Sequence, residues 1–91
     1  MTAKAVVDIS NLYGYGIDRF GRVQALRFVN DLRKTFTLLA EHPRLGRLAT
    51  SIRAGVRRHE HGSHIIVYEE TVDGILILAV VHASNIRRLE L

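Results

Sequence analysis

The chain has 91 residues, of which 47% are apolar and 24% are charged, and this composition predicts one folded domain over residues 1–91. The longest apolar run, residues 75–81, is far shorter than the roughly 20 residues of a membrane-spanning helix, so no membrane contact is expected. The absence of cysteine excludes disulfide bonds, thiol nucleophiles and cysteine–zinc sites, and it suits a cytoplasmic protein.

The charge is basic and unevenly distributed. The net charge is +4, and all but two of the 13 basic residues are arginine, whose planar fork suits phosphate and carboxylate partners. No acidic residue interrupts the segment between Pro43 and His59, which holds Arg44, Arg47, Arg53, Arg57 and Arg58. Arg87 and Arg88 form a second basic cluster. Such a surface fits nucleic acid or an acidic protein, although a merely solvated basic surface gives the same pattern.

The first half of the chain has helical periodicity. Ala5, Ile9 and Leu12 recur at helical spacing after Thr2, which can cap a helix that stops near residues 20–21. A second apolar stripe follows over residues 25–39. Pro43 ends this second helix, because the residue before a proline avoids helical angles. Two helices joined by a short glycine-containing turn predict an antiparallel hairpin.

The second half predicts strands over residues 56–60, 64–70 and 75–82. The turn signals between them are residues 61–63 and 72–74, the second ending in the strong turn dipeptide Asp-Gly. The strand at 75–82 is apolar on both faces and is therefore predicted to be central. The tail over residues 83–91 shows no clear period. The expected fold class is α+β, a helical hairpin packed on a small antiparallel sheet.

Some residues suggest chemistry. His59 and His61 share a strand face, but no third ligand has suitable spacing, so no metal site is predicted, and no phosphate-loop or other cofactor motif is present. Arg58, Tyr68 and His82 stand on neighbouring strands and would form a nuclease site if they shared one face. In the alternative interpretation, His82 bonds to backbone and Tyr68 fills the core.

Four stretches resemble the ParE group of the ParE/RelE toxin superfamily, the toxins of bacterial type II toxin–antitoxin pairs. They follow the family order and cover nearly the whole chain. They are Ala5-x-x-Asp8-Ile9-x-x-Leu12-x-x-Tyr15 with Phe20-Gly21; Ala25-x-x-Phe28-x-x-x-Leu32 with Leu39-x-x-x-Pro43-x-x-Gly46-Arg47; Ile52-Arg53-x-Gly55-x-Arg57-Arg58; and Ile66-x-Tyr68 with Ile75-x-Ile77 and Val80-Val81-His82.

The resemblance implies a cytoplasmic toxin that inhibits DNA gyrase, performs no reaction itself and is neutralised by a ParD-like antitoxin encoded beside it. An acidic amphipathic segment of the antitoxin would wrap the toxin. RelE-type relatives instead cleave messenger RNA on the ribosome, and Arg58, Tyr68 and His82 would carry that activity here. An inactive remnant that only binds antitoxin is the third interpretation.

The resemblance also implies candidate sites and one departure. The gyrase-binding candidates are Arg53, Arg57, Arg58, Arg87 and Arg88. The antitoxin-binding candidates are Leu12, Tyr13, Arg44 and Arg47. In the family a first strand precedes the first helix, whereas here Thr2 already occupies the helix start. A sheet of three strands instead of four is therefore expected, with an open edge that invites self-association or reliance on the antitoxin.

Overall fold

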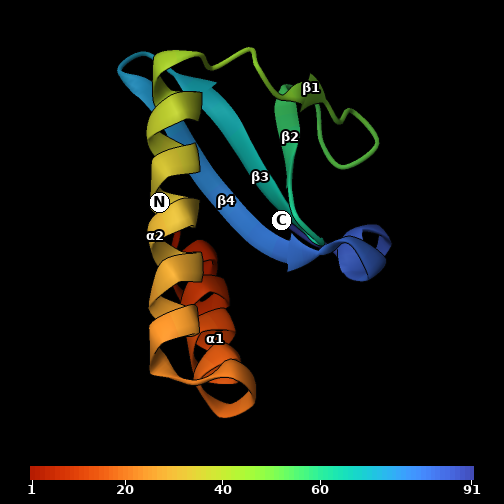
Figure 1. The fold of residues 1–91 in the computed structure, drawn as a ribbon. Helices are drawn as coiled ribbons and strands as arrows, with labels where there is room; N and C mark the ends of the chain where they lie inside the picture. Colours follow the sequence, from red (N-terminus) through yellow and green to blue (C-terminus); the bar gives the residue numbers. More distant parts are fainter.

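The computed structural model describes residues 1–91 as a helical hairpin packed on an antiparallel sheet (Figure 1). The elements are α1 (Ala3–Phe20), α2 (Arg22–Glu41), β1 (Arg47–Leu48), β2 (Val56–His61), β3 (His64–Thr71), β4 (Gly74–His82) and the 3₁₀ helix η1 (Ala83–Arg88). The predicted fold class, both helices and the three predicted strands are confirmed, with ends that lie within three residues of the predicted ones. The tail, whose sequence shows no clear period, forms η1 over most of its length.

Local chemistry sets the bounds of the hairpin. The hydroxyl of Thr2 accepts a hydrogen bond from the Ala5 N–H at 3.1 Å and so caps α1. Gly21 joins the two helices with φ of 83°, a conformation that glycine adopts without steric cost. The second helix ends at Glu41, two residues before Pro43. Both ends therefore lie where the capping and breaking signals predict them.

One core fills the space between the helices and the sheet. It consists of Ala5, Leu32, Leu39, Ile66, Tyr68, Ile77 and Val80, with Ile9, Leu12, Phe28, Phe36 and Ile75 packed around it. The helical members follow the two predicted apolar stripes, so hydrophobic burial on one face of each helix explains how the hairpin docks. Neither helix combines the length and apolarity needed to cross a membrane.

The prediction of three strands is wrong, because the sheet has four in the order β1-β2-β3-β4. The additional strand is β1, whose Arg47 and Leu48 pair with Arg58 and Arg57 of β2. Two residues are too few to show alternation, so no sequence pattern could reveal this strand. With four strands in one chain, the expectation of a three-stranded sheet that self-associates through an uncovered edge does not hold.

The prediction that the strand at residues 75–82 is central is also wrong, because β4 lies at the edge of the sheet. Its outer edge is met by the start of α1 instead of another strand. The Thr2 N–H donates to Ile77 O at 3.0 Å, the Thr2 hydroxyl donates to Leu78 O at 2.9 Å, and the Val80 N–H donates to the Asp8 carboxylate at 3.0 Å. The strand is apolar on both faces because both are covered, not because it has two neighbours.

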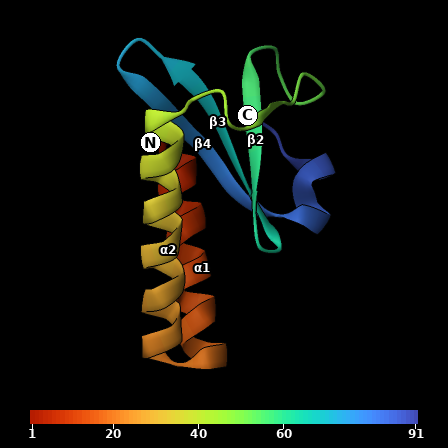
Figure 2. The ribbon, with the colours of Figure 1, turned by 45° about the horizontal axis from the view of Figure 1, so that its top comes forward.

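The sheet face away from the hairpin carries a second, smaller core. Its buried members are Val56, Ile65, Val67, Leu78 and Ala79, and Ile52, Leu76, Val81, Ile86 and Leu89 pack against them. Ile86 belongs to η1 and Leu89 follows it, so the C-terminal segment covers this face. In Figure 2 the hairpin lies on one side of the sheet and η1 on the other, while the turn between α1 and α2 projects beyond the sheet.

Candidate functional site

The three residues predicted to form a nuclease site do not converge. Tyr68 is completely buried in the core on the hairpin side of the sheet. Arg58 pairs with Val67 and lines a recess beside Ile86 and Leu89 on the opposite face. His82 lies on the hairpin side, at the end of β4 and against His64. An RNA phosphate therefore cannot meet all three groups at once.

Tyr68 has a structural role instead. Its hydroxyl donates to Pro43 O and accepts from the Gly46 N–H, both at 2.8 Å, so it ties the α2–β1 loop to the sheet. The guanidinium of Arg57 donates to Gly46 O at 2.8 Å and reinforces the same loop. Burial raises the pKa of the Tyr68 phenol above its ordinary value, although the Gly46 hydrogen bond and the Arg57 charge oppose this. The alternative interpretation, that Tyr68 fills core, is confirmed.

His82 is likewise engaged with backbone. Its Nδ1 accepts from the Ser84 N–H at 3.1 Å and lies 2.7 Å from the Ser84 hydroxyl, so the imidazole caps the start of η1. Because Nδ1 accepts the backbone hydrogen bond, the proton of the neutral ring sits on Nε2. The alternative interpretation of His82 as a backbone-bonded residue is also confirmed.

The gyrase-binding candidates differ in whether their guanidinium groups are already bonded to other groups of the chain. Arg53 pairs with Glu69 at 3.2 Å, Arg58 pairs with Glu60 at 3.1 Å, and Arg57 is held by Gly46 O. Arg87 and Arg88, in the last turn of η1, are exposed and form no ion pair. These two arginines are therefore available to an acidic partner without breaking an internal bond.

Arg58 and Arg87 line the same recess, together with Ser51, Ile52, Ile86 and Leu89. The Nε of Arg58 is buried there without a hydrogen-bond partner. The carboxylate of Glu60 forms ion pairs with both Arg58 and Arg47. Burial alone would raise the pKa of Glu60, but the backbone N–H and these two arginines outweigh it, and the pKa lies below its ordinary value.

The antitoxin-binding candidates fall into two groups. Arg44 and Arg47 lie at the β1 end of the sheet and face Glu70 and Glu60 at 3.6 and 2.9 Å. Leu12 and Tyr13 are half-buried residues of α1. Leu12 contributes to a groove beside β4, whereas Arg44 and Arg47 line no part of it, so the four candidates do not form one patch.

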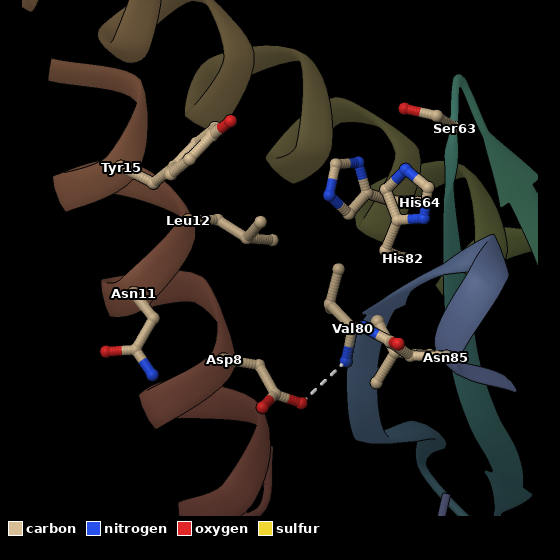
Figure 3. Close-up of a pocket in the computed structure, with 10 residues that line it drawn as sticks. Asp8, Asn11, Leu12, Tyr15, Ser63, His64, Val80, His82 and Asn85 are labelled. Atoms are coloured by element: carbon tan, nitrogen blue, oxygen red, sulfur yellow. Dashed lines mark hydrogen bonds between the residues drawn. The ribbon is translucent and has the colours of Figure 1, made fainter. Parts of the chain in front are cut away.

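This groove is the largest concavity of the molecule, at about 680 Å³, which lies within the range of ligand-binding pockets. We call it the α1–β4 groove. It is lined by Asp8, Asn11, Leu12 and Tyr15 of α1, by Ser63 of the β2–β3 turn, by His64, Val80, Val81 and His82 of the sheet, and by Asn85 of η1. Figure 3 shows Asp8, Leu12 and Tyr15 on one side, and His64, His82 and Asn85 across from them.

A stack of histidines, not predicted as a group, closes one end of the groove. His64 packs edge-on against His82 and Phe28, with ring centroids 5.3 and 5.6 Å apart, and Phe28 also contacts His61 at 5.7 Å. Thr35 of α2 lies 3.2 Å from His61 Nδ1. Burial lowers the pKa of His64, and the neighbouring His82 and His61 lower it further. No group of three or more side chains has an arrangement that could hold a metal ion.

The lowered pKa of His64 predicts a pH-dependent stability. The unfolded chain takes up a proton near the ordinary pKa of 6.5, whereas folded His64 does so only at lower pH. The unfolded state therefore binds more protons in between, and the free energy of unfolding falls as the pH drops from about 7.5 through the ordinary pKa of 6.5. In thermal melts, His64→Gln should reduce this loss, whereas His42→Gln, an exposed replacement outside the stack, should keep it. Equal pH dependence in the two variants would contradict the assignment.

Comparison with known proteins decides the family. The model of the ParE toxin of the type II toxin–antitoxin system, parDE, matches residues 1–87. The chain belongs to the ParE toxin family. It is similar to Toxin ParE1 of Caulobacter vibrioides, with 33% identity over 91 residues that cover 100% of this chain and 94% of the relative.

Further ParE relatives also match most of the chain. Toxin ParE1 of Mycobacterium tuberculosis is 29% identical over 83 residues, which cover 90% of this chain and 85% of the relative. The fold matches a structure described as the chromosomal ParDE TA system from P. aeruginosa, with a TM-score of 0.74, 24% identity and 89% of both chains covered. The resemblance inferred from the four sequence stretches is confirmed, and the chain is a ParE-type toxin of a type II toxin–antitoxin system.

Proposed function

We propose that this ParE-type toxin acts in the cytoplasm by inhibiting DNA gyrase and that a cognate antitoxin neutralises it by direct binding. The family match over residues 1–87 carries the proposal, since gyrase is the target typical of ParE toxins. Arg87 and Arg88 support it further, because they offer unpaired positive charge on an exposed turn of η1. Arginines that lose their water on binding often dominate the energy of a protein interface.

The geometry favours inhibition by binding over RNA cleavage. A nuclease of the RelE type needs basic or aromatic side chains gathered around one phosphate. Here Tyr68 is buried under the α2–β1 loop, and the sheet separates Arg58 from His82. No observation in the structure favours the nuclease interpretation, so we propose the gyrase inhibitor alone.

Supercoiling of relaxed plasmid by purified gyrase tests the proposal. The full chain, added in increasing amounts with ATP present, is expected to reduce supercoiling or to trap cleaved DNA. Prior addition of the antitoxin encoded beside the toxin gene is expected to restore supercoiling. Full gyrase activity at a large molar excess of folded toxin would overturn the proposed target. Inhibition that the antitoxin does not relieve would overturn the proposed neutralisation and leave the target standing.

A further inference from the structure

The recess that holds Arg58 and Arg87 combines an apolar floor with three polar groups. We call it the β2–η1 recess. It measures about 350 Å³ and is lined by Ser51, Ile52, Arg58, Ile86, Arg87 and Leu89. Ile52, Ile86 and Leu89 pack against the second core, so buried side chains hold the floor in place. Figure 2 shows η1 beside β2, the strand that carries Arg58. The volume lies at the lower end of the range of small-molecule sites, which points to a small ligand.

Arg58 brings a buried donor to this recess. Its side chain is only 23% exposed, and its Nη2 pairs with Glu60 at 3.1 Å. Its Nε–H is buried and has no acceptor within the chain. A buried N–H without an acceptor lowers stability, so an acceptor brought by a ligand is bound favourably there. An anion suits this position best, because hydrogen bonds between a guanidinium and an anion are stronger than those to neutral oxygens.

The other polar groups add to the positive character of the recess. Arg87 is exposed and forms no ion pair. Ser51 adds an exposed hydroxyl, which can donate a hydrogen bond. No carboxylate lines the recess, and Glu60 pairs with Arg58 from outside it. Two positive charges therefore stand beside an apolar floor, which strengthens their attraction for an anion.

A phosphate monoester matches these groups better than a carboxylate does. It presents three strong acceptor oxygens and a charge of about −1.5 to −2 at pH 7, so it can accept from both arginines and from the Ser51 hydroxyl at once. A carboxylate presents only two oxygens, and Arg58 already pairs with the carboxylate of Glu60. Clusters of arginine are a recurrent means of recognising phosphate groups.

The surroundings of the recess favour a single terminal phosphate over the backbone of a nucleic acid. A backbone needs unpaired cations along its path. Of the neighbouring arginines, Arg47 is paired with Glu60 at 2.9 Å. Arg53 is likewise paired with Glu69 at 3.2 Å. Beside its two arginines the recess offers the apolar floor instead, and this floor suits the organic part of a small ligand.

We propose that the β2–η1 recess binds the phosphate group of a small organic phosphate monoester. Arg58 and Arg87 donate hydrogen bonds to the phosphate oxygens, the Arg58 Nε–H among them, and the Ser51 hydroxyl donates a further one. The organic part of the ligand rests on the apolar floor, and Glu60 competes with the ligand for Arg58. The recess shares no residue with the α1–β4 groove, and the inference does not depend on gyrase as the target.

The first test compares three small anions in a phosphate-free buffer. The full chain is titrated with each anion, and the amide chemical shifts in NMR spectra measure the Kd. Phenyl phosphate joins a phosphate to an apolar ring, inorganic phosphate lacks the ring, and benzoate keeps the ring but carries a carboxylate. We expect phenyl phosphate to bind with a Kd of about 1 mM or below. Inorganic phosphate should bind at least about threefold more weakly, because it leaves the apolar floor unused, and benzoate at least about tenfold more weakly.

Charge variants test which residues hold the phosphate. Arg58→Gln and Arg87→Gln should each weaken the Kd for phenyl phosphate about tenfold or more. The matched control is Arg88→Gln, which removes the same charge one residue outside the recess and should change the Kd by less than about twofold. Glu60→Gln should tighten binding about twofold or more, because it removes the competing carboxylate. Thermal melts establish that each variant is folded. If Arg58→Gln does not fold, the exposed positions Arg87 and Glu60 decide the outcome.

Four results would overturn the assignment. The wild-type chain could show no saturable binding of phenyl phosphate. Equal losses in Arg87→Gln and Arg88→Gln would indicate attraction to a basic surface without a site. Benzoate or inorganic phosphate that binds as tightly as phenyl phosphate would remove the phosphate group or the organic part from the proposal. Single-stranded DNA without terminal phosphates that displaces phenyl phosphate at the same phosphate concentration would assign the recess to nucleic acid. Gyrase takes no part in these measurements, so their failure leaves the proposed function standing.

Discussion

Replacement of Gly46 by alanine is expected to lower the free energy of unfolding by about 2–4 kcal/mol, from overpacking and loss of a buried hydrogen bond. A Cβ at this position would lie 2.8 Å from the carbonyl oxygen of Arg58 and would also press on the hydroxyl of Tyr68. The Gly46 N–H donates to that same hydroxyl. The backbone of Gly46 has no positive φ, so the cost comes from contact and not from dihedral strain.

Gly14 provides the matched control for this prediction. It lies within α1, and a Cβ added there meets no atom within 4 Å. Gly14→Ala is therefore expected to raise stability by about 0.5–1 kcal/mol, because alanine is the better helix former. Urea denaturation of both variants measures the two changes.

The double variant Gly46→Ala with Tyr68→Phe tests the contact between these two residues. Removal of the hydroxyl relieves part of the clash, so the double variant should lose less free energy of unfolding than the sum of the two single losses. A Gly46→Ala chain as stable as wild type would contradict the packing described for the α2–β1 loop.

Simultaneous replacement of Arg87 and Arg88 by alanine is expected to reduce gyrase inhibition by about tenfold or more, the loss of about 1.4 kcal/mol of binding. Both side chains are exposed and without ion pairs, so the stability of the chain should change by less than about 0.5 kcal/mol. The concentration of toxin that halves supercoiling measures the effect. The control is Arg27→Ala with Lys34→Ala, which removes the same charge from the exposed face of α2. Equal inhibition by the two double variants would place the gyrase-binding surface elsewhere.

Periodicity predicted the helices and the long strands because each has several turns or pairs over which burial imposes a repeat. The apolar stripes of α1 and α2 face the core as expected, and the Asp-Gly turn joins β3 to β4. Two features lay beyond this reasoning. The strand β1 is too short to show any repeat, and the apolar character of β4 arises from coverage by α1 and the C-terminal segment, which local sequence does not distinguish from a central position.

The histidine stack could not be predicted from the sequence, because one irregularity changes the pairing of β3 with β4. The turn at Gly62 and Ser63 pairs His61 with His64, and this pair was open to prediction from the turn length. Counting back from the Thr71–Gly74 pair would set His64 opposite Val81. A β-bulge at Val67–Tyr68 leaves Leu78 unpaired and shifts the register by one, so His64 faces His82 instead.

The most direct test of the central claim is to induce this chain in bacteria and follow DNA synthesis and protein synthesis by pulse labelling in one culture. Inhibition of gyrase predicts that DNA synthesis stops first and that a DNA-damage response follows, while translation continues at early times. Early arrest of translation with continuing DNA synthesis would contradict the account and return the RNA-cleaving interpretation to first place. Undisturbed growth with accumulating folded protein would also contradict it. That result would show that the chain is not an active toxin, and binding of the antitoxin would be its remaining role.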